Sequence, residues 1–287
     1  MWNQMLCLGM MGSYGNAQLS AEEGLRLMAQ TGFEGFFSGW GGAENLRECR
    51  RLAGEIGLYY QSVHAPFGSV RALWHGTEEQ AQAALDELLL CLEDCAAVEG
   101  PVMVSHVYVG FKYREEPNEA GLARFETLVR RAAQLGVKIA FENTEGLAYL
   151  DAVMEMAAAY PEAAGFCWDT VHEMCYNAST DMPGRYPGRL LATHINDNLG
   201  VRDFGGKTTW HDDLHLLPFD GIGDWADAAR RLKDFEGPLT FELTTKSKPE
   251  RHENDKYARL PPEEYLAEAY ARACRVAALV RRAREKG

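Results

Sequence analysis

The sequence repeats one pattern of hydrophobic and polar positions, in which an amphipathic stretch ends at a glycine and a short apolar run follows. The first copy opens with the capping box Ser20-Ala-Glu-Glu23, ends at Gly32 and leads into the apolar run 33–37. Glycine suits this end because it readily adopts the left-handed conformation that closes a helix. The same order predicts further helices at about 44–57, 77–100, 118–136 and 147–160, followed by strands at 58–64, 102–106, 137–142 and 165–169.

Three more apolar runs, at about 5–10, 190–194 and 238–242, bring the number of predicted strands to eight. Strands that alternate with helices imply a parallel sheet joined by helical crossovers. Eight such units predict an α/β fold, a (β/α)8 TIM barrel that forms a single domain over residues 1–287, with a last helix at about 262–284 closing the outer ring. An open doubly wound sheet is the alternative. The sequence lacks the glycine-rich nucleotide motifs that often accompany such a sheet, which counts against it.

The charge balance limits which binding partners are expected. The chain has 29 basic and 42 acidic residues, a net charge of −13. A protein that binds nucleic acid or an anionic membrane usually carries a basic surface, so this balance argues against both partners. No apolar run reaches the roughly 18 residues of a membrane span.

Cysteine use and the N-terminus favour a cytoplasmic protein. The seven cysteines are an odd number without close pairing, which is typical of reduced thiols. Cys91 and Cys95 lie four residues apart on a predicted helix, and we interpret them as helix packing. The first residues lack the basic and long apolar segments of a signal peptide.

Potential metal ligands lie at the ends of six predicted strands: His64, His106, Glu142, Asp169, His194 and Glu242. In a parallel barrel all these ends open onto one face, so the side chains are expected to converge there. A single residue of this kind would most simply be a hydrogen-bonded loop residue. Its occurrence at six strand ends favours a metal site.

Three further residues could join this set. His172 follows Asp169 by three positions, and the long irregular segment 198–223 contains Asp213 and His215, which would point the same way if their segment is extended. Imidazoles and carboxylates without a thiolate suit a divalent metal ion such as Zn, Mn, Mg or Co. His64 and His106 could instead contact substrate, and Asp213 could be a turn former.

The motifs around these residues resemble those of the xylose-isomerase-like barrel superfamily, and the resemblance covers nearly the whole chain. They are Ser62-Val-His64-Ala-Pro66, Phe141-Glu142-Asn143, Trp168-Asp169-Thr170-x-His172, His194-Ile-Asn-Asp197, Asp213-x-His215-x-x-Pro218-x-x-Gly221-x-Gly223 and Phe241-Glu242. That superfamily includes sugar and sugar phosphate isomerases and epimerases, and also endonuclease IV.

In the isomerase and epimerase branch, the resemblance implies one divalent ion held by Glu142, Asp169, His194 and Glu242. The two glutamates would be catalytic, moving a proton at a carbon next to a carbonyl. The expected substrate-binding residues are His64, His106, His172, Lys207 and Lys246.

In the endonuclease branch, the resemblance implies three zinc ions. The first would be held by His64, His106 and Glu142, the second by Glu142, Asp169, His194 and Glu242, and the third by His172, Asp213 and His215. The D-x-H pair of the long segment favours such a multinuclear site. Against DNA stand the net charge and the scarcity of cations near the expected mouth.

We therefore expect a metal-dependent isomerase or epimerase of a small sugar or sugar phosphate, with one to three divalent ions per chain. A multi-zinc phosphoesterase is the alternative, and a non-catalytic metal- or sugar-binding barrel is a third reading. The expected partner is a small sugar, and a homo-oligomer is left open.

Overall fold

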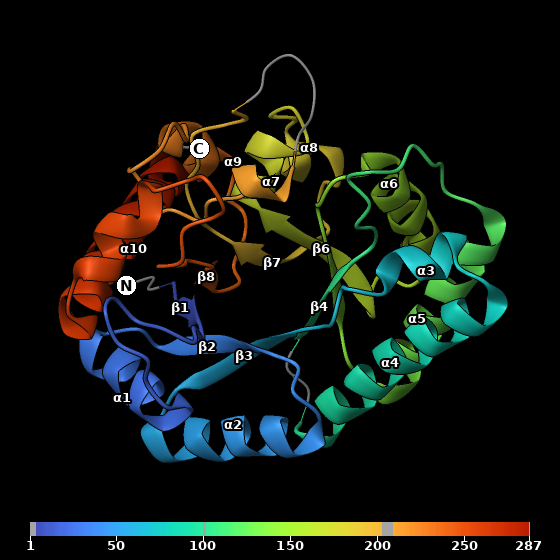
Figure 1. The fold of residues 1–287 in the computed structure, drawn as a ribbon, viewed down its shortest axis with the longest axis horizontal. Coiled ribbons are helices and arrows are strands. Elements are labelled where there is room, and N and C mark those ends of the chain that lie inside the picture. The colour runs from blue at the N-terminus through green and yellow to red at the C-terminus, as the bar shows by residue number, and fades with distance from the viewer. Residues whose placement is uncertain (1–3, 100–101, 203–208, 287) are drawn as a thin grey trace.

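The computed structural model describes residues 4–99, 102–202 and 209–286, and its eight strands form a nearly closed barrel inside a ring of helices (Figure 1). The strands are β1 Leu6–Gly9, β2 Gly35–Gly39, β3 Tyr59–His64, β4 Val102–His106, β5 Ile139–Glu142, β6 Ala164–Asp169, β7 Leu190–His194 and β8 Leu239–Phe241. Each pairs in parallel with its neighbour, in the order β7-β6-β5-β4-β3-β2-β1-β8. The predicted TIM barrel is confirmed.

The two ends of this order, β7 and β8, meet through a short seam. Ile195 forms a parallel bridge with Phe241, and its amide donates to the Thr240 carbonyl at 2.8 Å. Thr193 extends the seam, because its hydroxyl oxygen accepts from the Thr240 amide at 3.0 Å. A threonine side chain therefore replaces part of the strand ladder where the barrel closes.

The helices lie outside the strands. They are α1 Ala21–Thr31, α2 Ala43–Ile56, α3 Val70–His75, α4 Glu78–Ala97, α5 Glu119–Leu135, α6 Leu147–Met156, α7 Thr170–Cys175, α8 Met182–Arg185, α9 Trp225–Arg231 and α10 Pro262–Lys286, with 3₁₀ turns η1 Ala157–Ala159, η2 Trp210–Asp212 and η3 Glu253–Arg259. The capping box at Ser20 forms as predicted, and a second one caps α4.

Two helix ends differ from prediction. The helix expected to reach 100 ends at Ala97, because Val98 turns its side chain into the core and Glu99 takes the left-handed conformation with φ of 63°. Gly100, expected to fill that role, lies outside the described residues. The helix expected over 147–160 tightens into η1 after Met156.

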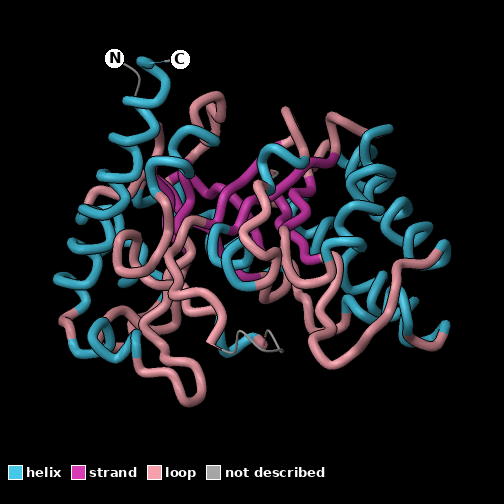
Figure 2. The backbone as a smooth tube through the Cα atoms, turned by 90° about the horizontal axis from the view of Figure 1, so that it is seen from above, coloured by secondary structure: helices cyan, strands magenta, loops and turns pink. Residues whose placement is uncertain are grey.

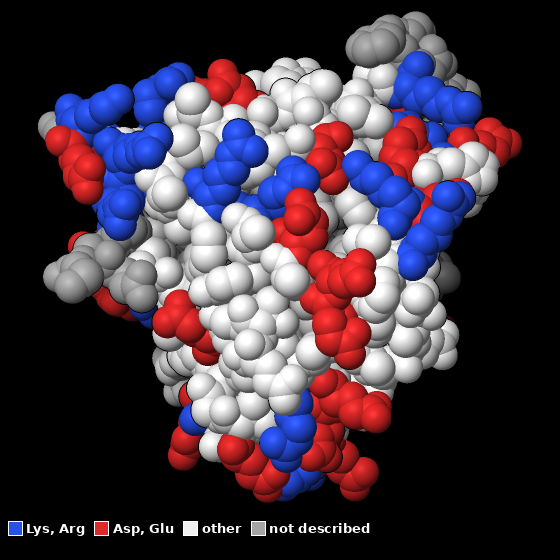
Figure 3. All heavy atoms as spheres, turned by 90° about the vertical axis from the view of Figure 1, so that its left-hand side faces the viewer, with Lys and Arg blue, Asp and Glu red and all other residues white. Residues whose placement is uncertain are grey.

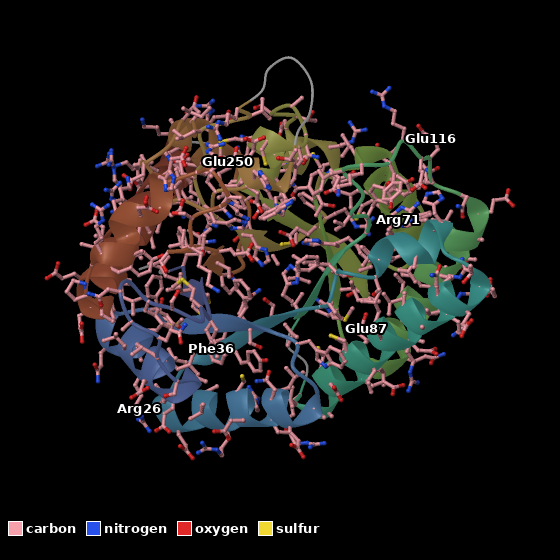
Figure 4. All side chains as sticks on the ribbon, viewed as in Figure 1. Arg26, Phe36, Arg71, Glu87, Glu116 and Glu250 are labelled. Atoms are coloured by element: carbon pink, nitrogen blue, oxygen red, sulfur yellow. The ribbon has the colours of Figure 1, made fainter. Side chains whose placement is uncertain are left out.

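The core has two layers. Large side chains fill the space between strands and helices, where Phe36 stacks on Tyr60 with ring centroids 4.7 Å apart. Figure 4 shows Phe36 within the ring of helices, whereas Arg26 on α1 points outward. Inside the barrel lies a layer of small residues, Val104, Ala140, Cys167 and Ala192. Because side chains alternate along a strand, the residues two positions further on also point inward.

The loops that follow the strands gather on one side of the sheet, the lower side in Figure 2. The face made by α1 and α10 carries basic and acidic side chains next to one another (Figure 3). Within the described residues, no helix is long and apolar enough to cross a membrane.

Candidate metal centre

Four adjacent strands deliver the inner part of the site. His106, Glu142, Asp169 and His194 are the last residues of β4, β5, β6 and β7. The strand register sets His106 beside Glu142 and Asp169 beside His194. The last three of these residues have no exposed surface, and His106 is also buried. The strand ladder therefore fixes where each of these side chains starts.

Glu142 is the hub of the site. Its Oε1 lies 3.0 Å from Nδ1 of His194. Its Oε2 lies 3.3 Å from Nε2 of His64 and 3.2 Å from Nε2 of His106. Both carboxylate oxygens thus face imidazoles from three other strands.

The nine predicted residues come together in three groups whose ligand atoms lie within 4.8 Å of one another. The groups are His64, His106 and Glu142; Glu142, Asp169, His194 and Glu242; and His172, Asp213 and His215. A further group contains Glu142, Cys167 and His194. Cys167 was not predicted to lie so close, because it precedes the strand end by two positions.

Two buried carboxylate oxygens in these groups lie close to imidazole nitrogens. Asp213 Oδ1 lies 2.7 Å from His215 Nε2, and Glu142 Oε2 lies 3.2 Å from His106 Nε2. Yet neither oxygen, both buried, has a hydrogen-bond partner among the described residues. Two ligands that each lie about 2.1 Å from one ion are about 3.0 to 3.4 Å apart. The 3.2 Å separation of Glu142 and His106 falls in this range, so the two residues could hold one ion together, whereas the 2.7 Å separation of Asp213 and His215 is shorter.

The charges of the site keep its carboxylates ready to bind a cation. Burial alone would raise the pKa of Glu242, but His194 and His215 lower it to about 2. Burial also opposes ionisation of Glu142, yet His194 and His106 hold its pKa well below the usual range. Asp169 differs, because burial and the charge of Glu142 raise its pKa to about 6. The lowered pKa values of Glu142 and Glu242 favour their ionised forms, which are the forms that a metal ion binds.

Two asparagines of the quoted motifs, Asn143 and Asn196, contact the candidate ligands, although the sequence analysis assigned them no role. Asn196 donates from Nδ2 to Asp169 Oδ2 at 3.0 Å. The carbonyl of Asn143 lies 2.8 Å from Nδ1 of His172. Asp169 also caps α7, since its Oδ1 accepts from the His172 amide at 2.7 Å. Such contacts behind the ligands fix their orientation.

The ligands of the long segment depend on a second loop. Asp212, next to Asp213, accepts from Arg251 Nη1 at 2.8 Å in a buried ion pair. Asn254 donates to the carbonyls of Leu214 and Thr244, both at 2.9 Å, and so joins the loop after β7 to the loop after β8. Arg202 Nη1 adds a hydrogen bond to the Glu250 carbonyl at 3.1 Å.

His215 itself is not extended, as its φ is 49°. The side chains of Asp213 and His215 nevertheless meet, because the left-handed residue turns the backbone at this point. The condition of an extended segment is therefore not met at His215, although the two side chains are close.

A family model described as xylose isomerase-like TIM barrel matches residues 25–273. The chain belongs to this family.

One relative is the protein y4fM of Sinorhizobium fredii (strain NBRC 101917 / NGR234), which is 28% identical over 270 residues, 83% of this chain and 80% of that protein. Among solved structures, an L-ribulose 3-epimerase superposes with a TM-score of 0.72 at 14% identity, covering 99% of this chain and 97% of the other. The IOLI protein with a binding zinc atom superposes with a TM-score of 0.69 at 17% identity. The match covers 96% of this chain and 98% of the other.

A fusion of a xylose isomerase-like TIM barrel with a 4-hydroxyphenylpyruvate dioxygenase gives a TM-score of 0.73 at 17% identity. The match covers 99% of this chain but 44% of the fusion protein. At these identities the structural similarities show the shared xylose isomerase-like fold.

A cavity of about 450 Å³ lies on the face of the barrel where the C-terminal ends of the strands open. Glu242 and His215 line it on the side of the metal centre, and Phe37 and Trp210 add aromatic surface. Lys246 also lines it, whereas Lys207 lies outside the described residues. Of the two glutamates expected to be catalytic, Glu242 borders the cavity and Glu142 is fully buried.

Proposed function

We propose that this chain is a divalent-metal-dependent enzyme that isomerises or epimerises a small sugar or sugar phosphate by moving a proton at a carbon next to a carbonyl. The observation that carries the proposal is the position of Glu242. This residue belongs to the group with Glu142, Asp169 and His194, and it also lines the cavity. A substrate in the cavity would therefore meet a carboxylate and the metal ligands together.

A divalent ion held by these four residues would supply charge that stabilises an enediolate. Glu242 is placed to remove the proton, because its carboxylate borders the cavity and its side chain is 26% exposed. Glu142 has no exposed surface, so its proposed part is to bind the ion and order the imidazoles around it. Of the two glutamates expected to be catalytic, we thus propose that Glu242 transfers the proton and that Glu142 binds the ion.

The family supports this reading. The superposed L-ribulose 3-epimerase is a ketose epimerase by name, and the IOLI protein is a barrel with bound zinc. The proposal extends those two properties to this chain.

The test is exchange of substrate hydrogen with solvent. The Mn-loaded protein is incubated with a panel of ketoses and ketose phosphates in ²H₂O, and deuterium next to the carbonyl is measured by NMR. We expect incorporation that Glu242→Gln abolishes and Glu236→Gln preserves, because Glu236 is exposed beyond the opposite end of β8. Absence of exchange with every member of the panel would contradict the proposal.

A multi-zinc phosphoesterase is the second candidate, and one observation favours it. The five residues outside the four-residue group form two further groups, one of which shares Glu142. A multinuclear centre of this kind activates water and holds a phosphate. Three zinc ions per chain by elemental analysis, with hydrolysis of bis(p-nitrophenyl) phosphate and no proton exchange, would establish this candidate over the first.

A further inference from the structure

The cavity beside the metal centre has a second, cationic wall. Besides Glu242 and His215, it is lined by Lys246 and Lys248, from the loop after β8, and by Ser13 from the loop after β1. The Ser13 hydroxyl lies 3.1 Å from the Thr245 hydroxyl, so the two loops are joined next to the lysines. The wall is therefore part of a connected surface.

The two lysines differ in their surroundings. Lys246 is exposed and makes no ion pair with any described residue, although its amide is held by the Thr244 hydroxyl at 3.1 Å. Lys248 is mostly buried, with Nζ 3.3 Å from Asp213 Oδ2 and 5.6 Å from the centre of the Trp210 ring. One ammonium is thus free to bind a ligand, and the other is tied to a candidate metal ligand.

The two lysines indicate the charge of the ligand that this cavity would bind. The chain has a net charge of −13, and carboxylates dominate the metal centre, so the overall field disfavours a small anion. At this cavity the Lys248 ammonium is balanced by Asp213, whereas the Lys246 ammonium has no carboxylate partner among the described residues and can attract an anion. An ammonium and a charged oxygen ligand form a stronger hydrogen bond than neutral groups do.

We propose that the cavity selects a sugar derivative with an anionic group, a phosphate or a carboxylate, which binds Lys246 and Lys248 while the reacting carbons face Glu242. The cavity volume of about 450 Å³ is within the range for small metabolites. Phe37 and Trp210 offer the C–H face of the sugar an apolar surface. This inference rests on the proposed function, whose substrate class it names.

The test compares matched probes on the metal-loaded protein by calorimetry at constant ionic strength. The probes are D-fructose, D-fructose 6-phosphate and D-glucuronate. We expect at least one anionic probe to bind about tenfold or more tightly than D-fructose, the size of a hydrogen bond to a charged group. Lys246→Met should remove most of this preference. Lys138→Met is the control, because Lys138 is exposed at the opposite end of the barrel before β5.

Equal binding of the three probes, or no binding of either anion, would overturn the inference. So would a preference that survives both Lys246→Met and Lys248→Met, since the anion would then bind the metal ion itself. The proposed function fails separately. If Glu242→Gln leaves proton exchange intact while the lysine-dependent preference persists, the anion site stands and the catalytic assignment is lost.

Discussion

The candidate ligands reach one centre from two kinds of backbone. His106, Glu142, Asp169 and His194 end four neighbouring strands, so hydrogen bonds of the sheet hold their backbones. Asp213 and His215 instead lie in the segment after β7 outside any strand. The strand ligands inherit their positions from the fold, and the loop ligands do not.

The loop ligands are held by residues far along the chain. Asp212 and Leu214, which flank Asp213, are bound by Arg251 and Asn254, about 40 positions later. The candidate ligands on strands should therefore keep their positions when nearby residues are changed, whereas those on the loop should not. Mutations at the strand ends and in the loops should therefore have different effects on metal binding and stability.

The largest effect is expected at the strand-borne hub. Glu142→Gln removes a charge that faces His64, His106 and His194, and it replaces an oxygen ligand by an amide nitrogen. We expect turnover in the proton-exchange assay to fall about 10³-fold with an unchanged circular dichroism spectrum. Wild-type turnover would remove Glu142 from the centre. Glu55→Gln, at an exposed position of α2, is the control.

The second effect tests the loop side. Asn254→Ala leaves two carbonyls without their shared donor, at a residue that is almost fully buried. We expect unfolding free energy to fall by about 2 kcal/mol and metal affinity to fall about tenfold, measured by denaturant titration and by competition with a chelator.

Asn118→Ala is the matched control for that variant. Asn118 caps α5 and donates to the Trp74 carbonyl at 2.7 Å, away from the centre. It should lose a similar amount of stability and keep its metal affinity. If the two variants bind metal equally well, Asn254 does not position the loop ligands.

The smallest effect is expected at Asp220, near the C-terminal end of the segment that joins β7 to α9. Asp220 accepts from Tyr257 Oη at 2.5 Å, Lys256 Nζ at 2.9 Å and Arg272 Nη1 at 3.2 Å. Burial would raise the pKa of Asp220, but these partners lower it. A lowered pKa means that the ionised form stabilises the folded chain. That contribution is present above the unfolded pKa of about 3.9 and is lost as pH falls through the folded pKa.

Asp220→Asn should therefore lower unfolding free energy by about 1 kcal/mol at pH 7, with a constant difference from wild type down to about pH 5. Below about pH 4 the difference should shrink as the wild-type carboxylate is protonated. Denaturant titrations across this range measure it. A difference that grows towards low pH would contradict the assignment.

The sequence was most informative where a local pattern determines position. Glu142 and Asp169 could be found because strand ends in a parallel barrel converge, and the structure brings these two carboxylates together. The short helices α3, α7, α8 and α9 escaped prediction because they span seven residues or fewer, too few for a periodic pattern.

The supporting residues could not be found in this way. Arg251 and Asn254 bind the loop ligands only because the folded chain brings two loops side by side. No periodicity or motif of the sequence marks them. Cys167 shows the same limit, since its approach to Glu142 depends on the register between β5 and β6.

The left-handed backbone of His215 has a consequence for heat resistance. A residue with a Cβ in this conformation carries about 1 kcal/mol of strain that glycine avoids and asparagine reduces. Selection for survival at high temperature alone would exchange His215 for one of those residues. The same exchange would delete an imidazole from the candidate centre, so a gain in thermal tolerance at this position would cost a candidate metal ligand.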